Sequence, residues 1–260
     1  MRSGPPGASE RVWLFGLHTV RDALANPARQ LHRLILTPNA RQRLGEDALA
    51  GVGIEPEMAD PRRFPAPLDP QSVHQGAALE ADPLDWGGIE GCCVPTLEHP
   101  APMILLLDRV TDPHNAGAIL RSAEVFGARA VIAPRRHSAP ETGALAKAAS
   151  GALERQPYLR VGNLGNAMEA LAELGYQLVG LEGTAEHALE TAVADAAEAP
   201  LALVLGAEGP GLRERTRTLC TTLARIDAAT AFASLNVSNA AAVALYLGSR
   251  RNETGRLHKP

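Results

Sequence analysis

Short apolar runs and helical periodicities alternate along most of the chain. Mainly apolar, strand-like runs recur after residue 100, at residues 103–107, 130–133, 158–161, 176–181 and 201–206. Runs this short with apolar residues on both faces are typical of buried parallel strands. The segments between them predict helices, at 116–126, 142–152 and 166–174. Strands alternating with helices predict an α/β fold with a mainly parallel sheet and helices on both faces.

The first eighty residues show a smaller pattern of the same kind. An apolar segment at 12–16, a strand at 34–36 and a strand with a tight glycine turn within 71–79 accompany predicted helices at 19–25 and 41–50. We predict five regions: a disordered leader at 1–10, a small α/β domain at 11–81, a linker at 82–102, a second domain at 103–251 and a tail at 252–260. The linker is assigned from its acidic residues, glycines and prolines.

A third pattern precedes the apolar run 240–246. Four polar side chains stand before or at its start: Ser234, Asn236, Ser238 and Asn239. Ser and Asn before an apolar run mark the beginning of a helix. The free backbone N–H groups of its first turn and the side-chain amides are then directed to the same side. The pattern therefore predicts a loop that ends in a helix from about Asn239. Two earlier stretches, 112–127 and 205–212, are candidates to meet it.

The stretch 112–127 follows a predicted strand, where ligands of parallel sheets gather. Asn115 lies near the start of the following helix, small residues at 116–118 allow another backbone to approach, and Arg121 lies about two turns further on. By spacing alone, an ordinary exposed helix arginine is the favoured interpretation of Arg121.

The stretch 205–212 carries three glycines after a strand. Its spacing fits neither a Walker phosphate loop nor a dinucleotide fingerprint, and Glu208 would repel a pyrophosphate. A neutral or cationic part of a ligand suits this loop better, although a simple strand-to-helix turn explains it too.

Charge and composition narrow the function classes. The formal net charge is −4, and residues 68–100 contain six acids and no lysine or arginine. This balance argues against non-specific nucleic-acid binding by the whole surface. Local arginine pairs remain available, at 41/43, 62/63, 135/136 and 250/251. The three cysteines, Cys92, Cys93 and Cys220, lack the spacing of a disulfide framework or a zinc site. No metal is expected, no apolar run spans a bilayer, and a cytoplasmic location follows as the default.

Together, three motifs resemble the SpoU/TrmH family of RNA ribose 2′-O-methyltransferases, within the SPOUT superfamily. They are Asn115-x-Gly117-x-x-x-Arg121-x-Ala123, Gly206-x-Glu208-Gly209-x-Gly211 and Ser234-Leu235-Asn236-Val237-Ser238. Each motif is weak to moderate alone, but their order and separations also match over about residues 102–251. The first part of the chain, with motifs at 16–20 and 74–76, looks like the small substrate-binding domain of RlmB-type 23S rRNA guanosine methyltransferases.

The resemblance implies properties that periodicity does not reach. It implies a deep C-terminal trefoil knot, S-adenosylmethionine as the cofactor, a homodimer and an RNA substrate, which we expect to be 23S rRNA in view of the first domain. By position, Gly206, Ile226 and Leu235 are expected to hold the adenosyl part. The expected catalytic cluster is Asn115, Arg121, Glu208, Ser234 and Asn236. Residues 227–230 depart from the family pattern.

The proposed family mechanism uses the residue matching Arg121 as a base. Arginine is not deprotonated in proteins. Our hypothesis is that Arg121 grips the phosphate beside the target ribose and stabilises the developing alkoxide, while the phosphate or water takes the proton. Asn115 and Glu208 are expected to orient Arg121, and Ser234 and Asn236 to fix the loop.

Three alternatives stay open at this point: a tRNA 2′-O-methyltransferase, a non-catalytic RNA-binding assembly factor of the same fold, and a dinucleotide-dependent oxidoreductase, which lacks its fingerprint. In the first domain, modest basic patches could contact RNA phosphates, at Arg29, Arg33, Arg41, Arg43, Arg62 and Arg63.

Overall fold

The computed structural model describes residues 11–69, 72–229 and 235–257 of the 260-residue chain. The predicted leader and Ser234 lie outside the described residues. The chain divides into two compact units, Met1–Asp85 with Glu141–Glu154, and Trp86–Pro140 with Arg155–Pro260. The second domain expected at 103–251 therefore contains a stretch, 141–154, that packs with the first unit.

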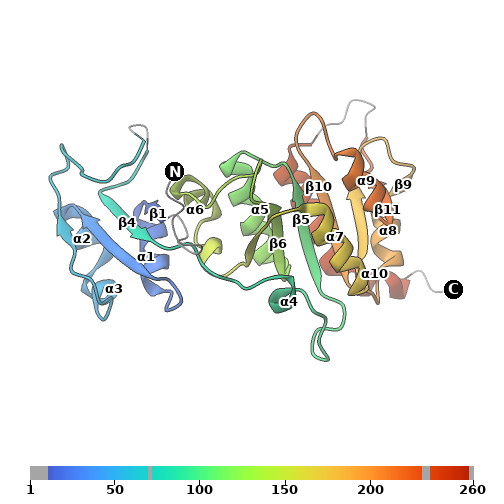
Figure 1. The fold of residues 1–260 in the computed structure, drawn as a ribbon, viewed down its shortest axis with the longest axis horizontal. Coiled ribbons are helices and arrows are strands. Elements are labelled where there is room, and N and C mark those ends of the chain that lie inside the picture. The colour runs from blue at the N-terminus through green and yellow to red at the C-terminus, as the bar shows by residue number, and fades with distance from the viewer. Residues whose placement is uncertain (1–10, 70–71, 230–234, 258–260) are drawn as a thin grey trace, which may run out of the picture. The chain divides into compact units, whose positions relative to one another are not determined.

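The first unit is built on a four-stranded sheet in the order β1-β4-β2-β3 (Figure 1). β4 pairs antiparallel with β1 and β2, and β3 pairs parallel with β2. Its elements are β1 (Val12–Phe15), α1 (Leu17–Ala25), β2 (Leu31–Leu36), α2 (Pro38–Leu44), α3 (Glu46–Leu49), β3 (Glu57–Met58), β4 (Ala77–Ala81), α6 (Gly143–Ala149) and a 3-10 turn, Ala152–Glu154. The predicted α/β character of this region is confirmed.

Glycines account for two local features of this unit. The single helix expected at 41–50 is wrong: Gly45 has a φ of 82° and separates α2 from α3, because a left-handed residue cannot continue an α-helix. The predicted glycine turn is confirmed at Gly76, with a φ of 78°. A Cβ there would lie 2.2 Å from Thr37 Oγ1, the oxygen that caps α2. The short β3 lies inside the loop expected at 51–70.

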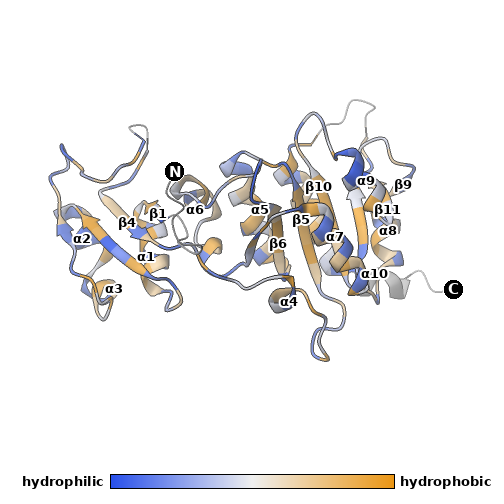
Figure 2. Ribbon diagram, viewed as in Figure 1, coloured by the Kyte–Doolittle hydropathy of each residue, from blue (hydrophilic) through white to orange (hydrophobic). Residues whose placement is uncertain are grey.

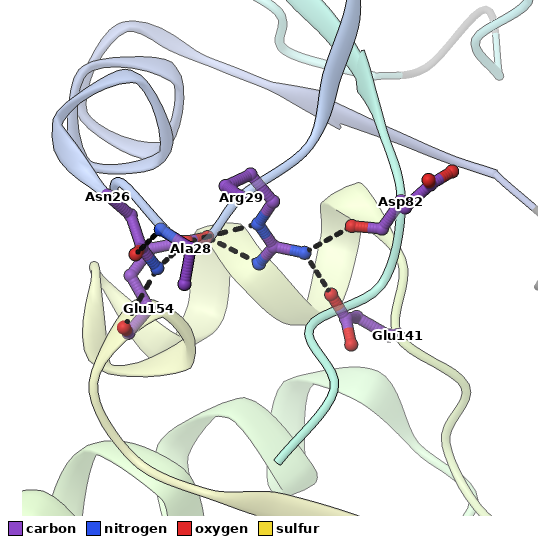
Figure 3. Close-up of polar contacts among 6 residues, drawn as sticks. All are labelled: Asn26, Ala28, Arg29, Asp82, Glu141 and Glu154. Carbon is purple, nitrogen blue, oxygen red and sulfur yellow. Dashed lines mark hydrogen bonds and ion pairs between the residues drawn. The ribbon is translucent and has the colours of Figure 1, made fainter. Parts of the chain in front are cut away.

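Arg29 fastens the stretch 141–154 to the rest of the first unit (Figure 3). Its guanidinium donates two hydrogen bonds to the Glu154 carboxylate, of 2.6 and 3.1 Å, one of 2.7 Å to Glu141 and one of 2.9 Å to the carbonyl of Asp82. Asn26 Nδ2 donates to Glu154 at 2.9 Å. These five residues form what we call the Arg29 clasp.

The Arg29 clasp corrects one prediction. Arg29 has a fully buried side chain, so it is not an RNA contact. Burial opposes its charge, but the hydrogen bonds and charges of Glu154 and Glu141 together raise the pKa of Arg29.

α6 also packs closely on β1, since a Cβ at Gly143 would lie 2.3 Å from the Phe15 ring.

The second unit contains a seven-stranded sheet in the order β7-β6-β5-β10-β8-β11-β9, with every pair parallel. Its strands are β5 (Met103–Asp108), β6 (Ala130–Pro134), β7 (Tyr158–Val161), β8 (Gln177–Leu181), β9 (His187–Ala188), β10 (Leu201–Gly206) and β11 (Thr222–Arg225). Its helices are α4 (Ile89–Cys92), α5 (Pro113–Val125), α7 (Leu164–Glu173), α8 (Leu189–Asp195), α9 (Glu214–Leu219) and α10 (Val237–Leu257).

Helices cover both faces of this sheet, as predicted. α5 and α8 both contact α10, which packs on β10, whereas α7 contacts α4 and α9. Alternate residues of β5 divide between the faces: Ile104 and Leu106 belong to the core under α7. On the α10 face, a Cβ at Gly248 would lie 2.4 Å from Met103 Sδ, so this helix lies close on the sheet. The central strands are accordingly the most apolar part of the unit (Figure 2).

Several elements of the second unit escaped prediction: α4, α8, α9, β9 and β11. α4 lies inside the expected linker 82–102, which is therefore partly ordered, and the hydroxyl of Tyr176 donates a 2.7 Å hydrogen bond to the carbonyl of Cys93 there. The predicted tail is helical as far as Leu257. The trefoil knot remains a prediction. Among the described residues, each helix is too short or too polar to cross a bilayer.

Candidate active site

Three predicted site residues meet at the carboxyl edge of the seven-stranded sheet. Asn115 lies in the first turn of α5, Glu208 follows β10, and Asn236 directly precedes α10. Asn236 Nδ2 donates to Asn115 Oδ1 at 2.9 Å, and Asn115 Nδ2 donates to Glu208 Oε1 at 3.4 Å. Asn236 Nδ2 also donates to Glu208 Oε1. We call these three residues the Asn–Glu–Asn cluster.

Glu208 ties the loop after β10 to the beginning of α10. Besides the two amide donors, its Oε1 accepts a 3.2 Å hydrogen bond from the backbone N–H of Val237. A carboxylate at this position also interacts favourably with the positive end of a long helix. The geometry therefore gives Glu208 a positioning role for α10.

Asn236 caps α10. Its Oδ1 accepts hydrogen bonds from the backbone N–H groups of Ser238, at 2.9 Å, and Asn239, at 3.4 Å. The carbonyl of Asn236 accepts the first helical hydrogen bond, from Ala240. The capped helix is confirmed, but it begins at Val237, two residues earlier than expected, because the cap is Asn236 rather than a residue nearer to Asn239.

The glycines around Glu208 are explained by the loop itself. Ala207 and Gly211 form an isolated antiparallel bridge, with the Gly211 N–H donating to the Ala207 carbonyl at 3.0 Å. A Cβ at Gly206 would lie 2.1 Å from the carbonyl carbon of Gly211. Gly209 and Gly211 have φ values of 83° and 67°, in the left-handed region that favours glycine. The motif therefore builds a tight turn that presents Glu208.

Arg121 is not part of the Asn–Glu–Asn cluster. It is exposed on α5, and among the described residues no hydrogen bond or ion pair reaches its guanidinium. The expected orientation of Arg121 by Asn115 and Glu208 is thus not seen, because those two side chains bond to each other and to Asn236. Ser234 lies outside the described residues, so its expected role stays a prediction.

The residues expected to hold an adenosyl group lie at loop ends. Gly206 ends β10, Ile226 follows β11 and is half-buried, and Leu235 is 48% exposed although it is large and apolar. At the departure from the family pattern, Asp227 forms a 2.9 Å ion pair with Arg225. The first departing residue is therefore held by its own strand.

One supporting carboxylate escaped prediction. Asp108 ends β5, is fully buried, and accepts hydrogen bonds from the backbone N–H and Nε of Arg213 and from Thr216 Oγ1, at 2.7–3.0 Å. These bonds fix the start of α9 and the end of the Glu208 loop. A charged residue directly after the apolar run 103–107 was the available signal.

The described residues were also considered as metal ligands and as thiol nucleophiles. Throughout the described ranges, no group of three or more His, Cys, Asp or Glu side chains could hold a metal ion. Burial raises the pKa of Cys93 and of Cys220 to about 12. Both thiols therefore stay protonated at neutral pH and are poor nucleophiles.

In the first unit, the predicted RNA contacts separate into two groups. Arg33 pairs with Glu57, and Arg41 pairs with Glu46, at the surface. Arg43, Arg62 and Arg63 are exposed and have no carboxylate partner among the described residues. These last three are the arginines of this unit that are best placed to meet a phosphate.

Comparisons with known proteins match both parts of the chain. Residues 102–246 match the SpoU rRNA Methylase family, and residues 13–86 match the family described as RNA 2′-O ribose methyltransferase substrate binding. A 23S rRNA (guanosine-2′-O-)-methyltransferase of Ralstonia nicotianae is 39% identical over 256 residues, covering 94% of this chain and 97% of its own. The enzyme of the same name from Vibrio parahaemolyticus is 44% identical over 247 residues, covering 92% and 96%.

A solved structure supports the fold. The SpoU methyltransferase AviRb from Streptomyces viridochromogenes superposes with a TM-score of 0.78 at 23% identity, covering 94% of this chain and 91% of its own.

Proposed function

The chain belongs to the SpoU rRNA methylase family, and on that premise we propose that it is an RNA 2′-O-ribose methyltransferase acting on a guanosine of 23S rRNA. The observation that carries this proposal is similarity over 92–94% of the chain. The relatives named 23S rRNA (guanosine-2′-O-)-methyltransferase match both the substrate-binding region and the methylase region, at 39–44% identity. The resemblance first drawn from three motifs is thereby confirmed.

S-adenosylmethionine is the methyl donor in this proposal, and when bound it supplies an electrophilic methyl group. The described residues suit it. Leu235 leaves a large apolar surface uncovered beside the Asn–Glu–Asn cluster, as a nucleoside base requires. The turn after β10 is exposed at Glu208, Gly209 and Gly211, and the carboxylate of Glu208 suits a cationic ligand. Gly206, Ile226 and Leu235 are the residues we assign to the cofactor.

Arg121 is the residue we assign to the reaction. A ribose hydroxyl must lose its proton to become a good nucleophile, and arginine stays charged in proteins. Arg121 therefore binds the phosphate beside the target ribose and stabilises the developing alkoxide, and the proton passes to phosphate or water. Its exposed guanidinium, unengaged within the described part of the chain, is free for that contact. Asn115, Glu208 and Asn236 position the loops, and we assign Ser234 to the same task from the family motif alone.

The active form in this proposal is a homodimer. Three large apolar side chains are exposed on the paired helices α5 and α10: Val125 at 70%, Tyr246 at 50% and Val243 at 37%. The Tyr246 ring packs edge-to-face on Phe126, with ring centroids 6.0 Å apart, which holds it in place. Tyr246→Lys with Val125→Asp should give a monomer by light scattering. Leu97→Asp, at a fully exposed loop position, should leave the dimer intact.

The test of the function is methyl transfer to defined RNAs. Purified protein is incubated with S-adenosylmethionine and in vitro transcribed 23S rRNA or tRNA, and digested RNA is searched for 2′-O-methylguanosine by mass spectrometry. We expect the product in 23S rRNA alone. Methylation of tRNA alone identifies the tRNA enzyme, and RNA binding without transfer identifies an assembly factor.

Variants at Arg121 test the mechanism. Arg121→Ala should lower the transfer rate by roughly 100-fold to 1,000-fold, as the loss of one oxyanion-stabilising donor does, with little change in cofactor affinity. Arg121→Lys retains a charge but not the planar fork. A lysine variant that keeps RNA affinity and most of the rate would show that a point charge suffices and would overturn the fork mechanism.

A further inference from the structure

Two neighbouring loops at the carboxyl edge of the seven-stranded sheet carry three exposed arginines. Arg109 follows β5, and Arg135 and Arg136 follow β6. The sheet order places β6, β5 and β10 side by side and parallel. The loops after these strands therefore form a row at one edge, which ends at Glu208 of the Asn–Glu–Asn cluster.

These arginines lack a carboxylate partner among the described residues, as Arg121 does, whereas five other arginines of the second unit have one. The unit's other arginines at the surface commonly form ion pairs with acids, as Arg155, Arg213, Arg215, Arg217 and Arg225 do. Within the described residues, no ion pair reaches Arg109, Arg135 or Arg136. In a chain with a net charge of −4 this concentration of unpaired positive charge does not follow from composition.

The two loops are held rigidly against each other. The Ala139 N–H donates to the Val110 carbonyl at 2.9 Å, which joins the loop after β6 to the loop after β5. Arg160 donates to the carbonyls of Ala139 and Arg135, at 2.8 and 2.9 Å. Arg135 Nε donates to the Arg160 carbonyl, which leaves its two terminal nitrogens for another partner. Exposed charges on a fixed backbone bind a ligand with less loss of conformational entropy.

Backbone strain marks the same two loops. Four described residues other than glycine have positive φ values, and two of them are Arg109, at 65°, and His137, at 60°. A side chain in this left-handed region costs conformational energy that glycine avoids. Such strain concentrates at functional sites, so the side chain at position 109 needs a reason beyond the fold.

We propose that Arg109, Arg135 and Arg136 form a track that binds the phosphate backbone of the RNA substrate beside the methyl-transfer site. Guanidinium forks match phosphate geometry, and the three arginines outnumber Asp112, the exposed acid of the loop after β5, so the net positive charge favours a polyanion. The track would hold nucleotides flanking the target ribose while Arg121 meets its phosphate. This inference rests on the proposed function and names residues that position its substrate.

The experiment compares Arg109→Gly and the double variant Arg135→Ala/Arg136→Ala with Arg215→Ala. Arg215 is also exposed in the second unit but pairs with Glu169, so it supplies the same charge change as Arg109 at another place. Binding of in vitro transcribed 23S rRNA is measured at several KCl concentrations, and kcat and KM of methyl transfer are measured with the same RNA. Cofactor affinity serves as the fold control.

We expect the salt slope of binding to fall by about one for each arginine removed. KM for RNA should rise several-fold, with kcat and cofactor affinity unchanged. Arg109→Gly separates binding from folding, because it relieves the left-handed strain: it should be at least as stable as the parent protein and still bind RNA more weakly.

Two results overturn the proposal in different ways. If the parent protein methylates RNA and the track variants bind it with the same slope and KM as Arg215→Ala, the track is wrong and the proposed function stands. If the parent protein neither binds nor methylates 23S rRNA or tRNA, the proposed function and the track both fail.

Discussion

Replacing Arg29 tests the clasp that joins residues 141–154 to the first unit. Arg29→Met keeps most of the side-chain volume and removes the charge and four donated hydrogen bonds, two of them to Glu154. The variant leaves the carboxylates of Glu141 and Glu154 buried without their cation. Removing one partner of a buried ion pair destabilises a protein far more than replacing both partners by apolar residues, because it leaves a buried charge without its counter-ion.

The magnitude follows from the cost of neutralising a carboxylate. The ordinary pKa of a glutamate carboxyl is 4.5, so protonating one such group at pH 7 costs about 3.4 kcal/mol, at about 1.36 kcal/mol per pH unit. Three hydrogen bonds to carboxylates and one to a carbonyl would suggest a larger loss, but water entry and protonation limit it. We expect the unfolding free energy of the first unit to fall by about 3–5 kcal/mol. For a unit of this size the midpoint should fall by about 12 °C or more.

The assay needs a signal from the first unit alone. Trp13 lies in β1 and Trp86 in the second unit, so a Trp86→Phe background reports the first unit by fluorescence. Hydrogen exchange supplies the second readout: amides of α6 should lose protection together with β1, while β5 stays protected. The control is Arg33→Met, which breaks an ion pair with half-exposed side chains and should have a much smaller effect.

The pH dependence offers a sharper discrimination. Because the penalty is the cost of protonating a carboxylate, the deficit of Arg29→Met should shrink as pH falls from 7 to 5, by at most about 1.4 kcal/mol per pH unit. The change is smaller than this limit to the extent that Glu141 of the parent protein, whose pKa is also raised, takes up a proton over the same range. A deficit that equals that of Arg33→Met, or that does not change with pH, would refute the clasp as an electrostatic fastening.

Three further predictions concern single positions. Burial raises the pKa of Glu141, so this group stabilises the fold below its ordinary pKa and that stability is lost as pH rises through its folded pKa; Glu141→Gln should remove this part of the decline in urea titrations between pH 4.5 and 8. Gly206→Ala should distort the turn and cost about 1–3 kcal/mol in thermal unfolding, whereas Gly209→Ala, whose Cβ would meet open space, should add only left-handed strain; equal losses would contradict this. Glu208→Gln keeps an acceptor for the Val237 N–H and should retain more methyl transfer than Glu208→Ala; equal activities would show that the acceptor does not position α10.

The sequence predicted the central strands because they are apolar on both faces, which only a strand buried between two helix layers can be. β5 and β10 are buried throughout, except for the last residue of β10. α9 and β11 escaped prediction for the opposite reason: each has only one buried residue, Thr216 and Ala224 respectively. α8 could have been predicted from the sequence, since its buried residues recur at helical spacing.

The Arg29 clasp lay beyond sequence reasoning. Arg29 contacts Glu141 and Glu154, which follow it by 112 and 125 residues. Nothing in the local pattern distinguishes Arg29 from the surface arginines near it, and it was grouped with candidate RNA contacts. Burial of a charge is decided by partners that come from another part of the chain, so periodicity around the residue carries no signal of it.

The candidate site also combines a feature that the local sequence predicts with contacts between residues far apart in the chain. Physics of the local sequence predicted a capped helix near Asn236, and the cap is there. The sequence already made the stretches around Asn115 and Glu208 candidates to meet this loop, but the choice of these two side chains, 121 and 28 residues away, came from the family resemblance. Yet the contacts of these three side chains are mutual and structural, and each is explained by capping or loop closure. Arg121 and Glu208 are the charged residues of the predicted catalytic cluster. Of the two, only Glu208 is engaged in hydrogen bonds within the described part of the chain. Capping and loop closure thus account for the hydrogen bonds within the Asn–Glu–Asn cluster, which is why we propose Arg121 for the chemistry of methyl transfer.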